Sequence, residues 1–179
     1  RPGDIARSAY RSGDVAHSQA AAKGAGAMAR EGAVDALVKG SLHTDELMAE
    51  VVSSETGLRT ERRISHVFIM DVPTYPRMLL ITDAAINITP TLDEKVDIVQ
   101  NAIELAQVLQ VPEPKVAILA AVEMVMSKQS STLDAAALCK MAERGQIVGG
   151  VLDGPLAVDN AVSTVAAKTT GSRSVGAGR

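Results

Sequence analysis

Small polar side chains that could bind an oxyanion follow a short apolar run in the first third of the chain. Residues 34–39 predict a strand that stops at Gly40, and a helix is expected to begin at Thr44. Such a turn exposes unpaired backbone N–H groups at the positive end of the helix dipole, which favours anions. The hydroxyls of Ser41 and Thr44 can donate hydrogen bonds, and the imidazole of His43 can donate or accept them. The segment predicts an oxyanion pocket; in the alternative interpretation, Thr44 only caps the helix and His43 is a partly buried polar residue.

Two later segments carry further candidate side chains. Asn87 lies in a loop between a predicted strand and a capped helix, where it either fixes the loop or touches a ligand. Asp83, at the end of that strand, is either a carboxylate of the site or a turn-forming residue. Further along, Gly154 allows close backbone approach, and Asp153 either lines a site or caps a helix that begins at Pro155. Asn87 and Asp153 are therefore weaker candidates, expected to shape a cleft.

Other reactive residue types have simpler interpretations. Cys139 falls within a predicted helix among apolar neighbours, so we expect it in the core and not as a nucleophile. Arg62 and Arg63 are most simply a solvated edge, although the pair could meet a phosphorylated cofactor. The sequence has no CxxC, HExxH or GxSxG pattern, and no GxGxxG follows a strand. It therefore predicts no metal site, no hydrolase nucleophile and no dinucleotide cofactor.

The composition is that of an ordinary globular chain of 179 residues, of which 46% are apolar and 22% charged. Aromatic residues make up only 2%, so we expect an aliphatic core, as in parallel sheets covered by helices. A net charge of −3 predicts no general attraction to nucleic acid or anionic membranes. No stretch approaches the roughly 18 apolar residues of a membrane span. The single cysteine excludes an internal disulfide and fits a reducing cytoplasm.

Strands are expected to alternate with helices along most of the chain. The clearest helix is 91–110, because Thr91 and Glu94 form a capping box and apolar residues recur at the spacing of a buried stripe. Strands at 63–72 and 77–82 flank a Pro-containing turn and predict an antiparallel hairpin. The other expected elements are helices at 17–30, 44–52, 132–144 (with a cap at 131–134) and 155–167, and strands at 34–39, 115–121 and 147–152. Gly32 is expected to stop the first of these helices.

This order of elements predicts an α/β fold, a three-layer sandwich with a mostly parallel sheet and one antiparallel hairpin. Residues 1–14 lack apolar periodicity and are expected to be a poorly ordered lead-in. Residues 15–168 form the central α/β portion, and residues 169–179 are expected to be a flexible tail. The chain starts with Arg1 and ends in a run of small residues, and we interpret it as a fragment of a longer protein.

Four segments, in this order, resemble the phosphate acetyl/butyryltransferase family. They are ALVKGSLHT at 36–44, DAAINITPT at 83–91, PKVAIL at 114–119, and DGPL at 153–156 with Asp159. The form of the first segment is similar to the butyryl-type or enoyl-hydratase-fused branch. The resemblance covers residues 15–168, and four ordered segments make it more specific than any one of them.

The resemblance implies reversible transfer of a short acyl group, acetyl or butyryl, in which acyl-CoA and inorganic phosphate give acyl phosphate and coenzyme A. It implies a fold similar to isocitrate and isopropylmalate dehydrogenases and a cytoplasmic homodimer or larger homo-oligomer. It also implies that coenzyme A is a substrate and that no metal or other cofactor is needed. The family's Ser-Arg pair and Asp, which bind phosphate and activate the thiol, lie in a C-terminal segment that we expect to be absent, so no catalytic residue is assigned.

For the residues present, the resemblance implies that Ser41, His43 and Thr44 lie on the acyl phosphate or CoA side of a cleft that Asn87 and Asp153 help to shape. Two other functions stay open. One is a non-catalytic acyl-CoA-sensing module of a larger enzyme, which would bind acyl-CoA without phosphate-dependent release of CoA. The other, a domain of a decarboxylating dehydrogenase, is disfavoured because the sequence has no Asp cluster suited to a divalent metal and no cofactor motif.

Overall fold

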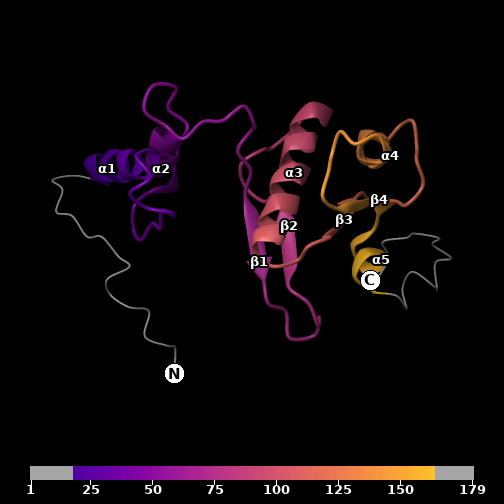
Figure 1. The fold of residues 1–179 in the computed structure, drawn as a ribbon. Coiled ribbons are helices and arrows are strands. Elements are labelled where there is room, and N and C mark those ends of the chain that lie inside the picture. The colour runs from indigo at the N-terminus through magenta and orange to yellow at the C-terminus, as the bar shows by residue number, and fades with distance from the viewer. Residues whose placement is uncertain (1–17, 164–179) are drawn as a thin grey trace. The chain divides into compact units, whose positions relative to one another are not determined.

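Residues 18–163 are described by the structure, which is a computed structural model (Figure 1). The chain divides between Arg62 and Arg63 into two compact units. The predicted lead-in at 1–14, the predicted tail at 169–179 and the predicted helix end at residue 167 lie outside the described residues.

The first unit holds two helices that contact each other, α1 (Ser18–Arg30) and α2 (Thr44–Val51). After α1 the chain turns at Gly32, as predicted, with a φ of 68° that glycine adopts without steric cost. The N–H of Ala33 donates to the carbonyl of Met28 (2.9 Å), which satisfies one of the last carbonyls of the helix.

The strand predicted at 34–39 is wrong. These residues form no ladder, and the Val38 side chain is 88% exposed. An isolated strand leaves its backbone groups unpaired, and the described part of the first unit contains no second strand that could pair with it. The helix predicted after it is confirmed as α2, which begins at Thr44.

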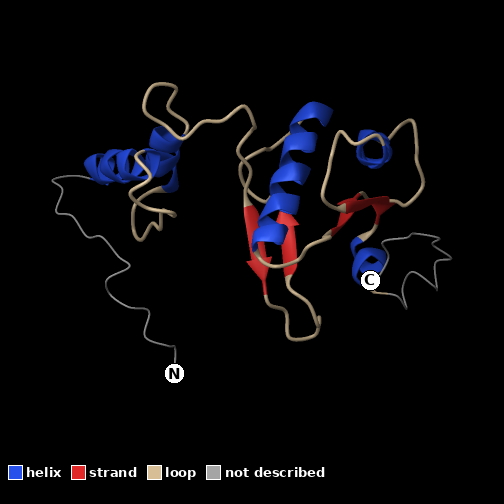
Figure 2. Cartoon of the chain, in the orientation of Figure 1, coloured by secondary structure: helices blue, strands red, loops and turns tan. Residues whose placement is uncertain are grey.

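The predicted antiparallel hairpin is confirmed, and it consists of β1 (Val67–Met70) and β2 (Leu79–Thr82) (Figure 2). β1 starts later than predicted because the residues before it bind α3 (Leu92–Val108). The Nδ2 of Asn101 donates both to the carbonyl of Arg63 (2.9 Å) and to the Oγ of Ser65 (3.0 Å). These bonds replace strand pairing at residues 63–65.

The start of α3 has the predicted capping box. The N–H of Glu94 donates to the Oγ1 of Thr91 (3.3 Å), and the N–H of Thr91 donates to the Oε2 of Glu94 (2.8 Å). The predicted apolar stripe is confirmed as well, because Val99 and Ile103 of α3 belong to the buried core cluster.

Thr91→Ala is expected to lower the free energy of unfolding by about 1 kcal/mol, because it leaves the N–H of Glu94 without its acceptor. Urea unfolding of this variant, compared with Thr89→Ala in the same loop, measures the effect. Thr89 is exposed and takes no part in the box. Equal losses in the two variants would contradict a capping role.

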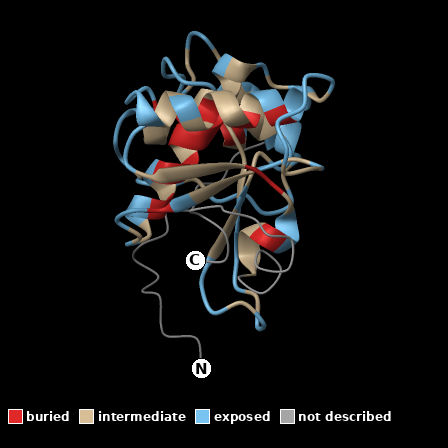
Figure 3. Cartoon of the chain, turned by 90° about the vertical axis from the view of Figure 1, so that its right-hand side faces the viewer, coloured by how far each residue is buried: buried red, intermediate tan, exposed pale blue. Residues whose placement is uncertain are grey.

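The second unit continues with β3 (Lys115–Leu119), α4 (Ser130–Glu143), β4 (Val151–Leu156) and α5 (Val158–Val162). β3 and β4 pair in parallel, and α4 contacts both strands. The core cluster joins α3 and α4 with Ile147 of the loop before β4, and partly buried side chains of both strands pack against it (Figure 3). Its buried members are Val99, Ile103, Leu138 and Ile147.

Residues 147–150 were predicted as the first part of a strand, but they pack on α3 instead. The side-chain amide of Gln100 takes the place of a neighbouring strand: its Nε2 donates to the carbonyl of Val148 (3.1 Å), and the N–H of Val148 donates to its Oε1 (3.0 Å). Gln107 Nε2 donates to the carbonyl of Gly149 (2.9 Å). The ladder of β4 therefore begins only at Val151.

The helix predicted to begin at Pro155 is wrong, because Pro155 lies inside β4. The β3–β4 register shifts between Ala117, which faces Asp153, and Leu119, which faces Leu156. Proline cannot donate to a ladder and is tolerated where the pairing is irregular. The shift gives Pro155 such a place, and the helix begins three residues later as α5.

The N-terminal cap predicted at residues 131–134 is also wrong. The N-cap residue of α4 is Gln129, and its side chain makes no capping bond. Asp134 instead forms an ion pair with Lys95 of α3, with 2.6 Å between Nζ and Oδ2. The carboxylate therefore links two helices and does not cap its own.

The described residues thus form an α/β fold with one parallel and one antiparallel strand pair. They do not form the single, mostly parallel sheet of the predicted three-layer sandwich, because β1–β2 and β3–β4 are separate two-stranded sheets. The prediction included a strand at 34–39 that is not formed. It also placed all strands in one sheet, whereas each strand pairs only within its own two-stranded sheet.

Candidate functional site

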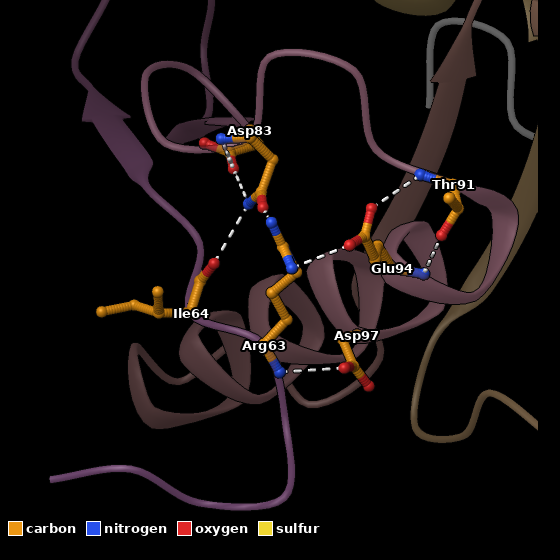
Figure 4. Close-up of polar contacts among 7 residues, drawn as sticks. Arg63, Ile64, Asp83, Thr91, Glu94 and Asp97 are labelled. Carbon is orange, nitrogen blue, oxygen red and sulfur yellow. Dashed lines mark hydrogen bonds and ion pairs between the residues drawn. The ribbon is translucent and has the colours of Figure 1, made fainter. Parts of the chain in front are cut away.

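Asp83 follows the carboxyl end of β2, and its carboxylate gathers the backbone N–H groups of its own loop (Figure 4). Its Oδ1 accepts from the N–H groups of His66, Ala85 and Ile86, each at 3.2 Å. Its Oδ2 accepts from the N–H of Asn87 (2.9 Å) and from the Asn87 Nδ2. Successive N–H groups that converge in this way form an anion-binding nest. Here the nest is filled by Asp83 itself, which supports the turn-forming interpretation of this residue.

These hydrogen bonds control the ionisation of Asp83. Burial alone would raise its pKa, but the bonds from the Asn87 side chain and from the backbone N–H groups of residues 85–87 outweigh burial and lower the pKa to about 2. The group is therefore a permanent carboxylate at neutral pH. A proton carrier in catalysis needs a pKa near the working pH, so Asp83 is not suited to that role.

Asn87 and Arg63 tie this loop to the rest of the second unit (Figure 4). The Nδ2 of Asn87 donates to the carbonyl of Ile64 (3.0 Å), and its Oδ1 accepts from the Nε of Arg63. The Nη1 of Arg63 pairs with the Oε1 of Glu94 at 2.7 Å. The backbone N–H of Arg63 donates to the Oδ2 of Asp97 (2.9 Å). The guanidinium thus holds the 83–91 loop to α3, and the Asn87 side chain fixes the loop.

The N-terminus of α3, which follows this loop, is already occupied. The Thr91 N–H lowers the pKa of Glu94, slight desolvation opposes the shift, and the Arg63 charge adds to it. The Glu94 carboxylate and the Thr91 hydroxyl together take up N–H groups that would otherwise be open to an anion. The 83–87 nest is therefore filled, and the capping box takes up two of the N–H groups at the start of α3.

The start of α2 has a different arrangement. The side chains of Ser41, His43 and Thr44 are all exposed, and the predicted cap at Thr44 is in fact at His43, whose side chain makes no capping bond. Lys39 Nζ donates to the carbonyl of Leu42 (3.0 Å), which closes a turn before the helix. The first turn also carries two acidic residues, which share the positive end of the helix dipole with any bound anion.

Asp153 lies inside β4, opposite Ala117 of β3, and so it does not cap a helix. The predicted close approach at Gly154 is confirmed. A Cβ at this position would lie 2.7 Å from the Ile118 carbonyl oxygen and 2.8 Å from the Ile118 Cβ. Only glycine therefore fits between the two strands here.

Cys139 is a partly buried residue of α4, in line with its predicted place in the core. Its Sγ lies 3.8 Å from the carbonyl oxygen of Gly154. Burial, followed by the negative charges of Asp153 and Glu143, raises the pKa of the thiol to about 11. The thiolate is the reactive form, so this residue is not an activated nucleophile.

Two residues that were not singled out from the sequence meet at the parallel strand pair. The Nδ2 of Asn160, on α5, donates to the Oε1 of Glu123, in the loop after β3. They are 37 positions apart in the sequence. One signal could have found them, because both follow the carboxyl ends of expected parallel strands, where ligands bind in α/β folds.

The five predicted site residues fall into two groups. Ser41, His43 and Thr44 share one turn in the first unit, whereas Asn87 and Asp153 belong to the second. Within the second unit, Asn87 lies in the loop after β2, which belongs to the antiparallel sheet, whereas Asp153 lies inside β4 of the parallel sheet. Between residues 18 and 163, no helix is long and apolar enough to cross a membrane. The same residues contain no group of three or more His, Cys, Asp or Glu side chains that could hold a metal ion.

Comparison with known proteins gives consistent results. The family described as "Phosphate acetyl/butaryl transferase" matches residues 14–179. A phosphate acetyltransferase of Rhizobium meliloti is 64% identical over 165 residues, which are 92% of this chain and 52% of that protein. A phosphate butyryltransferase of Clostridium acetobutylicum is 45% identical over 140 residues, which are 78% of this chain and 46% of that protein. The chain therefore spans about half the length of these relatives.

A solved structure resembles the chain over most of its length. It is a branched-chain phosphotransacylase from Enterococcus faecalis, with a TM-score of 0.82 and 31% sequence identity. The match covers 92% of this chain and 58% of the solved one.

Proposed function

Because the chain belongs to the phosphate acetyl/butyryl transferase family, we propose that it takes part in the transfer of a short acyl group between coenzyme A and inorganic phosphate. Acyl-CoA and phosphate would give acyl phosphate and coenzyme A. The observation that carries this proposal is the family match over residues 14–179, together with relatives named for acetyl and for butyryl transfer.

We place the binding of phosphate or acyl phosphate, or of the CoA phosphates, at Ser41, His43 and Thr44. This transfer needs donors that hold phosphate and stabilise a tetrahedral oxyanion. Two exposed hydroxyls and one exposed imidazole supply donors, and the start of α2 has no side-chain cap that would compete for its N–H groups. The filled nest at Asp83 and the capping box at the start of α3 support the same choice, because they take up N–H groups that an anion would need.

Asn87 and Asp153 serve as cleft-shaping residues in this proposal. The bonds of Asn87 to Asp83, Ile64 and Arg63 fit a residue that sets the course of its loop. Asp153 lies in β4 opposite Ala117 of β3, next to Gly154, where the two strands leave no room for a larger residue, so the strand pairing fixes the position of its backbone.

Further features follow from the family and belong to the proposal. They are an isocitrate/isopropylmalate dehydrogenase-like fold for the whole protein, a homodimer or larger homo-oligomer, and a cytoplasmic location. We also propose that the reaction uses no metal ion or other cofactor, with coenzyme A as substrate, because a thiol and a phosphate need a base and oxyanion donors but no redox step.

Phosphate-dependent release of CoA from acetyl-CoA and butyryl-CoA, detected with a thiol reagent, tests the function. Release that requires phosphate supports acyl transfer. Acyl-CoA binding without such release would contradict transfer by this chain and would favour an acyl-CoA-sensing module.

Ser41→Ala and His43→Ala are each expected to weaken phosphate or acyl-CoA binding about tenfold, because each removes one hydrogen bond to a charged group. Titration calorimetry with inorganic phosphate and with acetyl-CoA measures the change. Ser54→Ala is the matched control, since Ser54 is also an exposed serine of the first unit. Affinities within twofold of the unchanged chain for both variants would remove this site from the proposal.

A further inference from the structure

β3 and β4 end at the same edge of their parallel pair. The ladder runs from Lys115 opposite Val151 to Leu119 opposite Leu156, and the N–H of Ala120 extends it by donating to the carbonyl of Leu156 (3.0 Å). From this edge, β3 leads into the loop 120–129 and β4 leads into α5 (Figure 1). Ligands of α/β folds bind beyond the carboxyl ends of parallel strands.

One hydrogen bond joins the two segments that leave this edge. The Nδ2 of Asn160 donates to the Oε1 of Glu123. Asn160 is 2% exposed and is the buried residue of α5, whereas Glu123 is half-buried. A buried amide therefore holds a carboxylate that is still open to solvent.

The far end of the same loop is held as well. The side chain of Thr132, which is fully buried in α4, accepts from the N–H of Met126 (2.9 Å) and contacts the carbonyl of Met126 (3.1 Å). Hydrogen bonds to Asn160 and to Thr132 thus hold Glu123 and Met126, so both ends of the short segment between them are fixed. Such preorganisation favours ligand binding because less freedom is lost.

The Glu123–Asn160 pair has acceptors to spare. The Oδ1 of Asn160 is buried and has no hydrogen-bond partner in the described chain, and no hydrogen bond among residues 18–163 uses the Oε2 of Glu123. Buried polar atoms are nearly always paired, so an unpaired acceptor calls for a donor. Of the two, the Glu123 carboxylate is the one open to solvent, and as a charged acceptor it attracts N–H or O–H groups and repels phosphate oxygens.

Apolar side chains lie next to this pair in the sequence. Met124, Val125 and Met126 are 74%, 57% and 42% exposed. The site thus combines exposed apolar surface with a charged hydrogen-bond acceptor. An uncharged ligand with amide N–H groups, a hydroxyl and methyl groups fits this chemistry.

We propose that Glu123 binds the pantetheine arm of coenzyme A by accepting hydrogen bonds from its amide or hydroxyl groups, and that Asn160 is the positioning residue for Glu123. This inference rests on the proposed function, because it assigns a subsite for the CoA substrate.

Glu123→Gln tests the proposal, because it keeps the size of the side chain and replaces one acceptor oxygen by a donor. The dissociation constants for CoA and for pantetheine are expected to rise about tenfold, whereas that for inorganic phosphate stays unchanged. Glu113→Gln is the matched control: Glu113 is exposed and lies just before the amino end of the same strand. Its three constants are expected to stay within twofold.

Asn160→Asp separates positioning from folding. It sets two carboxylates against each other and is expected to lower both the melting temperature and the CoA affinity. In the double variant Glu123→Gln/Asn160→Asp, the glutamine can donate to the new aspartate, so the melting temperature is expected to recover while CoA affinity stays low. Recovery of both would mean that the pair serves only the fold, which would overturn the proposal.

The remaining outcomes are also decisive. Unchanged binding of CoA and pantetheine by Glu123→Gln, equal weakening of phosphate binding, or no pantetheine binding by the unchanged chain would each overturn the subsite. If the unchanged chain catalyses acyl transfer and Glu123→Gln leaves CoA and pantetheine binding unchanged, the subsite is contradicted and the proposed function is not. CoA and pantetheine binding that depends on Glu123, without acyl transfer, would support the subsite and contradict the function.

Discussion

Asp83→Asn is expected to lower the free energy of unfolding at pH 7 by about 2 kcal/mol. The carboxylate accepts from three backbone N–H groups of its own loop, from that of His66 and from the side chain of Asn87. An amide in its place turns an N–H group toward some of these donors. Because the pKa is lowered from 3.8 to about 2 in the folded chain, linkage gives an upper value of about 2–2.5 kcal/mol, which solvent screening at this partly exposed carboxylate reduces to about 2 kcal/mol or less.

The same shift predicts a pH dependence. A group whose pKa is lowered by folding makes its full contribution to stability when the pH is above its pKa in the unfolded chain, here 3.8. That contribution is lost as the pH falls through the pKa of the folded chain, about 2. Urea unfolding between pH 7 and pH 2 measures it. The Asp83→Asn variant is expected to show a flatter decline below pH 4 than the unchanged chain.

Asp71→Asn is the matched control for this series. Asp71 is exposed and no hydrogen bond or ion pair holds its side chain within residues 18–163, so its replacement is expected to change the free energy of unfolding by less than about 0.5 kcal/mol. If both variants lost equal stability, or if Asp83→Asn kept the full acid dependence, the nest would not be the source of the effect.

Gly154→Ala is expected to destabilise the second unit by about 2–3 kcal/mol, the upper part of the range for overpacking. The new Cβ would stand 2.7 Å from the backbone oxygen of Ile118 and 2.8 Å from its Cβ, and neither atom is the end of a flexible side chain. The two strands must therefore separate. Hydrogen exchange is expected to show lost protection at the β3–β4 ladder and at Ala120, with the β1–β2 hairpin much less affected.

Gly24→Ala is expected to change the stability in the opposite direction from Gly154→Ala. Nothing lies within 4 Å of a Cβ added at Gly24, which is inside α1, so alanine is expected to stabilise that helix by about 0.5–1 kcal/mol. Slower amide exchange along α1 would show it. If Gly154→Ala were as harmless as Gly24→Ala, the strands would have room that the structure does not give them.

Local signals in the sequence predicted local structure well. The capping box at Thr91 and Glu94, the turn at Gly32 and the hairpin between residues 63 and 82 all depend on neighbours within a few positions, and all are confirmed. The close approach at Gly154 was also predicted, because glycine has no side chain to prevent it, although the prediction did not place Gly154 in a strand.

The errors arose where a distant partner decides the structure. Residues 34–39 have the composition of a strand but no neighbour to pair with, and the side chain of Gln100 takes the backbone groups of Val148 that a strand would have used. Pro155 resembles a helix start in sequence, yet the register shift opposite β3 gives it a place in β4. Pairing and register depend on residues far away in the chain, which a local pattern does not contain.

The candidate site shows the same division. The exposed hydroxyls and imidazole before α2 could be named from their spacing, but their role stays a prediction. That the Asp83 loop fills its own nest, and that Asn160 meets Glu123, could not be derived, since both depend on how loops close in three dimensions. From the residue type alone, Asp83 could be either a carboxylate of the site or a turn-forming residue.

The raised pKa of Cys139 has a practical consequence for measuring the reaction. With a pKa of about 11, only about one thiol in ten thousand is ionised at pH 7, and disulfide reagents react with the ionised form. Cys139 is the one cysteine of this chain, so the folded chain is nearly silent toward such a reagent. Colour that develops in a continuous assay therefore reports liberated coenzyme A, and a slow protein-dependent drift would report unfolding of α4.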